Sequence, residues 1–215
     1  MNDKLFFIAI SVALLFEGAF FFALSLIYKS QEKKSLRLLN TFLFEVTPSF
    51  NEKYSYINYF LFFGIAVSIF PYVYYVAYNV NTFSMTIMIL SVLLAFCLAS
   101  LPFISLNKLR EHFYLALGGL VSLFSLYVME AYYCGRLYFV FYQDAIHLVA
   151  MIVSLIFAAF VLFMIVNPKL FDLKNDKDES GRPVRKKFIF LAFSELILYP
   201  LSILALLPIL LISIQ

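Results

Sequence analysis

Long apolar runs separated by short polar segments are the main feature of this chain. Runs of Leu, Ile, Phe, Val and Ala last about 20 residues or more, the length that a helix needs to cross a hydrocarbon core ~30 Å thick. The short alternating segments of a transmembrane barrel are not seen in the sequence. Backbone groups left unpaired in hydrocarbon cost several kcal/mol, so helices are the remaining spanning form. The pattern predicts an all-α, polytopic integral membrane protein.

The runs predict a bundle of six transmembrane helices that form a single domain over residues 1–215. The expected helices cover approximately residues 5–28, 57–79, 82–105, 113–134, 145–166 and 188–213. The fourth of these has the smallest side chains on its first half, which suits a central, closely packed position.

A further, amphipathic helix is predicted in the first long connection, at about residues 33–46. Its apolar residues recur at three-to-four spacing and basic residues lie nearby, until Thr47 and Pro48 break the pattern. Such a helix is expected to lie in the cytoplasmic membrane interface. The alternative is a docking helix for a partner protein.

Basic residues are distributed very unevenly among the connections. Every Lys and Arg except Lys4 and Arg136 falls in the segments 29–56, 106–112 and 167–187. These three segments follow alternate helices, and the positive-inside rule therefore predicts that they are cytoplasmic. With an even number of helices, both termini are expected on the extracellular side of a cell membrane.

Composition agrees with lipid as the main solvent and excludes some functions. Hydrophobic residues make up 64% of the chain and charged residues only 13%, against roughly 25% charged in a typical soluble domain. The net charge of +3 is too small to suggest nucleic acid as a partner. Cys97 and Cys134 are isolated, so neither a disulfide framework nor a metal site is expected, and no motif indicates a cofactor.

Glu17 interrupts the first apolar run close to its middle. A carboxylate near the bilayer centre costs from ~3 kcal/mol upward, so we expect Glu17 to be protonated, paired or facing a wet cavity. Ala9 and Ala13 lie on the same face, two turns and one turn earlier, which favours close packing of another helix. Glu17 therefore has two interpretations, a hydrogen bond that holds helices or subunits together and a relay for protons or cations.

A second intramembrane polar position is predicted in the last helix. Glu195 lies in its cytoplasmic half, and Ser202 shares the same helical face. Pro200 leaves a backbone carbonyl unpaired nearby, and this carbonyl is a possible part of the site.

Polar and aromatic side chains also gather at the predicted outer surface. They include Glu130, Asp144, His147, Tyr132 and Tyr133. One interpretation is an interfacial belt, because tyrosine is enriched at bilayer surfaces. The other is an outer vestibule whose acids admit a cation or a small polar molecule.

No catalytic motif supports an enzyme: metalloprotease, nucleophile-elbow, phosphate-loop and paired-aspartate patterns are all missing from the sequence. The first functional hypothesis is therefore a transporter or binding component for a proton, an ion or a small solute. The second is a non-catalytic accessory subunit of a larger membrane complex. A third hypothesis, a lipid-modifying enzyme at the outer leaflet, would require Glu130, Asp144 and His147 to converge.

Overall fold

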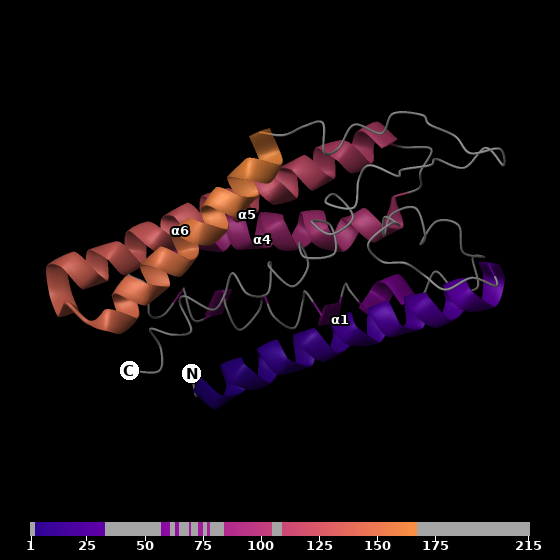
Figure 1. The fold of residues 1–215 in the computed structure, drawn as a ribbon, viewed down its shortest axis with the longest axis horizontal. Helices are drawn as coiled ribbons and strands as arrows, with labels where there is room; N and C mark the ends of the chain where they lie inside the picture. Colours follow the sequence, from indigo (N-terminus) through magenta and orange to yellow (C-terminus); the bar gives the residue numbers. More distant parts are fainter. Residues whose placement is uncertain are drawn as a thin grey trace.

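A computed structural model of the chain describes residues 3–32, 57–60, 63–64, 69, 73–74, 77, 84–104 and 109–166, and the regular elements in these residues are all helices (Figure 1). The α-helices are α1 (Asp3–Glu32), α4 (Ser84–Ser100), α5 (Leu109–Arg136) and α6 (Ala145–Val166). The 3₁₀-helix η3 (Leu101–Phe103) follows α4, and the π-helix η5 (Leu137–Tyr142) follows α5. For this part of the chain, the predicted all-α class is confirmed.

Two helical segments in the described residues are long and apolar enough to cross a membrane. They are Tyr114–Tyr142, which combines α5 with η5, and Ala145–Val166. The apolar stretches Ser11–Ile27 and Ser84–Ser100 are shorter. The predicted helices at 33–46 and 188–213 lie outside the described residues, and the helix predicted at 57–79 is described only in part.

The end of α4 follows from a single proline. Proline has no backbone N–H and its ring disfavours the α-helical turn before it, so Pro102 favours the end of α4. The chain forms η3 instead, and the N–H of Ile104 donates to the carbonyl of Leu101 at 3.3 Å. The helix expected at about 82–105 thus changes from α to 3₁₀ geometry after Ser100.

α5 is longer than its apolar run predicts at both ends. It carries Glu111 in its first turn and Arg136 in its last turn, and both charges interact favourably with the helix dipole and so stabilise the helix ends. Beyond Arg136 the chain continues as η5, so that Gln143 and Asp144 alone separate helical residues there. Residues 135–142, which lie between two of the helices expected from the sequence, are therefore helical.

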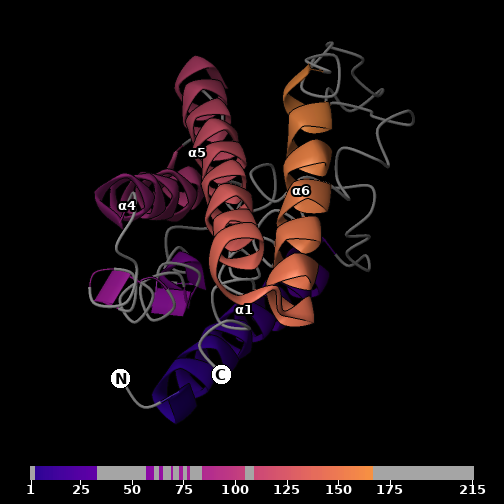
Figure 2. The ribbon, with the colours of Figure 1, turned by 90° about the vertical axis from the view of Figure 1, so that its left-hand side faces the viewer.

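α5 packs against both α4 and α6 and lies between them, and α1 lies below these three helices in the views of Figure 1 and Figure 2. At the contact with α4, a Cβ atom added at Gly118 would lie 3.4 Å from the Cys97 sulfur. At the contact with α6, the Tyr127 and Phe157 rings have centroids 5.4 Å apart. Among the described helices, α5 therefore has helical neighbours on two sides, and its central place in a six-helix bundle stays a prediction.

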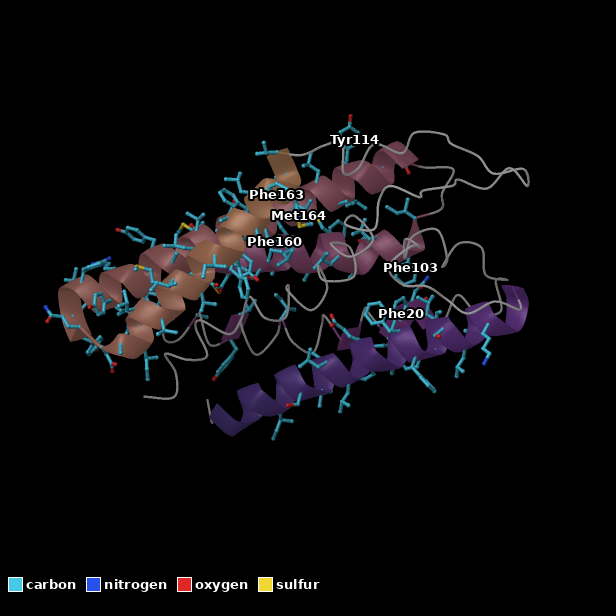
Figure 3. The ribbon with its side chains drawn as sticks, viewed as in Figure 1. Phe20, Phe103, Tyr114, Phe160, Phe163 and Met164 are labelled. Carbon is cyan, nitrogen blue, oxygen red and sulfur yellow. The ribbon has the colours of Figure 1, made fainter. Side chains whose placement is uncertain are left out.

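One apolar core joins these helices. Phe20 and Leu24 of α1 belong to the same buried cluster as Leu98 of α4, Leu123 of α5 and Val161 of α6. Figure 3 shows Phe20 on the side of α1 that faces the other helices and Tyr114 directed away from them. The described helices thus share one apolar interior, and the buried polar side chains described below are surrounded by it.

Candidate functional site

Glu17 lies in the interior near the middle of α1. Its residue is only 3% exposed, and it belongs to a buried stripe with Ala13, Phe20 and Leu24. Three-to-four spacing puts these four residues on one helical face. The sequence therefore places a carboxyl on the same face that buries α1 against the core.

A glycine from the second predicted helix covers this face of α1. A Cβ atom added at Gly64 would lie 3.2 Å from the Ala13 carbonyl oxygen, 3.2 Å from the Phe16 Cβ and 3.8 Å from the Glu17 Cγ. Phe60 and Phe63 flank the contact, and each ring centroid lies 6.4 Å from that of Phe16. Glu17 is thus covered by closely approaching backbone at Gly64, next to a group of aromatic rings.

Glu17 has an oxygen that is not hydrogen-bonded in this enclosure. Within the part of the chain that the structure describes, Oε1 is buried and has no hydrogen-bond partner. Leaving a buried acceptor unsatisfied costs about 1–3 kcal/mol, and such atoms in native proteins call for an explanation such as an ion or a functional role. A carboxyl in this position can hold a proton or accept a small cation or hydrogen-bond donor.

Glu130 is completely buried in α5, with 0% of its residue exposed. Its carboxyl acts electrostatically on the Tyr127 hydroxyl and the Cys134 thiol, one turn away on either side. The interpretation of Glu130 as part of an open outer surface does not fit this position. Glu130 is instead a second acidic group in the interior of the described helices.

His147 is also buried, at 2% exposure, near the start of α6. The Tyr142 ring of η5 stacks on its imidazole, with centroids 5.4 Å apart and planes at 12°. Nδ1 of His147 has no hydrogen-bond partner among the described residues. The Tyr142 ring thus covers His147 on one side, and His147 is buried and not part of an open surface.

The remaining members of that group have separate positions. Asp144 begins α6, where its Oδ1 accepts a hydrogen bond from the N–H of Ile146 at 3.2 Å. An acceptor at this position satisfies a free helix N–H, so the carboxylate has a capping role. Tyr132 is exposed and Tyr133 is partly buried. The predicted vestibule residues therefore do not share one open face.

The other predicted site residues, Glu195 and Ser202, lie outside the described residues, as does Pro200. Sequence reasoning also missed a buried polar residue, Ser154, whose Oγ has no hydrogen-bond partner in the described part of the chain. Its signal was its position seven residues after His147, on the same face of an otherwise apolar helix.

The described residues contain no group of three or more His, Cys, Asp or Glu side chains that could hold a metal ion. Cys97 and Cys134 are both buried and unbridged. Comparisons with protein families, with curated proteins and with solved structures find no match. The chemistry of the buried acids is therefore the basis for any functional proposal.

Proposed function

We propose that this chain is a multi-pass membrane protein with six transmembrane helices, cytoplasmic connections at 29–56, 106–112 and 167–187, and extracellular termini. The uneven distribution of basic residues supports this orientation. The two long apolar helices that meet at Gln143 and Asp144 support the membrane location.

Within this frame, the protein binds or passes a proton, a small cation or a small polar solute at Glu17. The observation that carries the proposal is the buried carboxyl of Glu17, whose Oε1 lacks a hydrogen-bond partner in the described residues. Acidic side chains inside membrane segments are costly, and they commonly mark proton relays and ion pathways. A purely structural carboxyl would be expected to use both oxygens in bonds to neighbouring helices.

Glu17 would act by changing between a neutral and a charged form. The neutral acid is tolerated at this buried position, because it carries no net charge to desolvate. Release of the proton would require a bound cation or water to stabilise the carboxylate. Glu195 and Ser202 of the last predicted helix are proposed as the second polar position of the pathway.

The test uses purified protein in lipid vesicles that contain a pH-sensitive dye, with a potassium diffusion potential to drive proton entry. Native protein is expected to acidify the lumen faster than empty vesicles, and Glu17→Gln is expected to remove this difference. Glu111→Gln is the matched control, because it removes an exposed carboxyl at the start of α5 and should leave the rate unchanged. Equal rates for native protein, Glu17→Gln and empty vesicles would contradict proton passage.

A different face of α1 supports a second candidate, an accessory subunit of a larger membrane complex. Leu14, Leu15, Gly18 and Phe22 are exposed together, and a Cβ atom added at Gly18 would meet nothing within 4 Å. A glycine on an apolar face allows another membrane helix to approach closely. Purification in mild detergent should then yield a stoichiometric partner protein that Gly18→Leu releases, whereas a chain that purifies alone would contradict this candidate.

A further inference from the structure

The turn between α5 and α6 is unusually apolar for a connection between helices. Its residues run LYFVFY, and Phe139, Val140, Phe141 and Tyr142 are all exposed, with Phe139 and Tyr142 at 67% each. We call these four residues the hairpin tip. In Figure 1 the tip lies at the far end of the α5–α6 pair, away from the other ends of both helices. A connection that faced only water would be expected to carry polar side chains.

The backbone of this turn forms its hydrogen bonds internally. The N–H of Gln143 donates to the carbonyl of Tyr138 at 3.0 Å, and the N–H of Leu148 donates to the carbonyl of Asp144 at 3.3 Å. Gln143 takes a left-handed conformation with φ of 48°, which reverses the chain with few non-helical residues. Because polar backbone groups need partners wherever water is scarce, this arrangement suits a poorly hydrated environment.

Charge near the tip is sparse. Between the buried Glu130 and Asp144, whose carboxylate caps α6, the sequence contains one charged residue, Arg136, which is exposed. Its guanidinium lies 5.9 Å from the centroid of the Phe141 ring. Aromatic rings beside a cation that can reach lipid phosphate are typical of membrane interfaces.

From these observations we propose that the hairpin tip is inserted into the lipid interface, with its rings and the guanidinium of Arg136 together at the level of the lipid headgroups. The tip thereby anchors the α5–α6 hairpin at a fixed depth. The occupant of this surface is lipid and not a partner protein. The inference rests on the proposed membrane location of α5 and α6. The experiment below distinguishes a failure of the inference from a failure of that membrane location.

The chain contains no tryptophan, so one introduced tryptophan reports its surroundings without background. Phe141→Trp labels the tip, and Phe139→Trp is a second tip reporter in case the first disturbs folding. Ile156→Trp labels an exposed position midway along α6. Each full-length variant is placed in vesicles of phosphatidylcholine and phosphatidylglycerol. Its emission is then measured with aqueous iodide and with lipids brominated either near the headgroup or near the chain end.

The proposal expects the tip tryptophans to lose most emission with bromine near the headgroup and little with iodide, and Ile156→Trp to lose most with bromine near the chain end. If iodide quenches the tip while Ile156→Trp behaves as expected, the tip is in water and the inference is overturned. If bromine near the chain end quenches the tip tryptophans most, the tip lies too deep and the inference is overturned as well. If no quencher reduces their emission, protein covers the tip, which also overturns the inference. If no brominated lipid quenches Ile156→Trp, the membrane location itself fails, and the inference fails with it.

Discussion

Gly64 lies so close to Ala13 that a methyl group in place of its hydrogen would stand 3.2 Å from the Ala13 carbonyl oxygen. The crowded atom belongs to the backbone of α1, which cannot move aside as a flexible side chain does. The absence of a side chain at residue 64 therefore determines how closely the second predicted helix covers Glu17.

Gly64→Leu is expected to separate these segments and to destabilise the protein by ~1–3 kcal/mol, the usual cost of overfilling a packed contact. Unfolding of the purified protein in mixed detergent micelles measures the change. Gly18→Leu would alter the proposed partner face, so Gly18→Ala is the better control. With nothing within 4 Å of the added Cβ, it is expected to raise stability by about 0.5–1 kcal/mol. A loss for Gly18→Ala as large as that for Gly64→Leu would contradict the contact.

Gly135 and Met151 form a second close contact, where a Cβ atom added at Gly135 would lie 2.9 Å from the Met151 sulfur. Because methionine is flexible, Gly135→Ala is expected to cost less than ~1 kcal/mol. Gly135→Ile should cost ~1–3 kcal/mol, because a branched side chain needs more room. The same micelle unfolding assay measures both.

Met151→Ala should relieve part of the Gly135→Ile cost, giving a coupling energy of ~0.5–3 kcal/mol in a double-mutant cycle. Additive effects of the two substitutions would mean that the two residues do not meet.

His147 offers a contrast between shape and polarity. His147→Ala removes the ring that stacks on Tyr142 and is expected to cost ~2–4 kcal/mol. His147→Phe keeps a ring in the same place and removes the unsatisfied Nδ1, so stability should stay equal or rise. Thermal unfolding in detergent distinguishes the two substitutions, and a loss for His147→Phe that equals that for His147→Ala would show that the imidazole nitrogens are needed.

Two fully buried serines are expected to differ in the sign of their effect. Ser154 has no hydrogen bond to its Oγ in the described residues, so Ser154→Ala should raise stability by up to ~1 kcal/mol. Ser91 donates from its Oγ to the Ile87 carbonyl at 2.7 Å, so Ser91→Ala should lower it by about 0.5–1 kcal/mol. Chemical unfolding of both variants under one condition tests the difference, which disappears if Ser154 is satisfied by a neighbour or a ligand.

The apolar runs predicted helices well, because length and hydropathy are properties of the chain itself. α6 occupies the residues over which its run predicts a helix, and Asp144 marks its start as a capping residue. η5 was missed because the apolar side chains of residues 137–142 fit a π-helix, an α-helix or an interfacial loop equally well. The early start of α5 was missed because its first turn is polar, whereas the expected helix was placed only over the apolar run.

The candidate site was harder to predict for a geometric reason. The sequence gives the depth of a residue along its helix. Whether the side chain is buried depends also on which side of the helix the neighbouring helices lie, and the sequence does not give that directly. Glu130 and Tyr132 lie at similar depth and differ by about 200° around α5, so one is buried and the other exposed. Sequence reasoning grouped them by depth alone. The burial of Glu17 was easier to predict, because the small residue Ala13, one turn earlier on the same face, indicated where another helix packs.

The two-residue break at Gln143 and Asp144 also bears on how the protein is made. So short a connection makes α5 and α6 antiparallel, so that the start of α5 and the end of α6 lie at the same end of the pair (Figure 1). Under the proposed membrane location, two residues are too short a connection for a separate domain or a long loop between the spans. The two helices are then expected to enter the membrane together, as one helical hairpin.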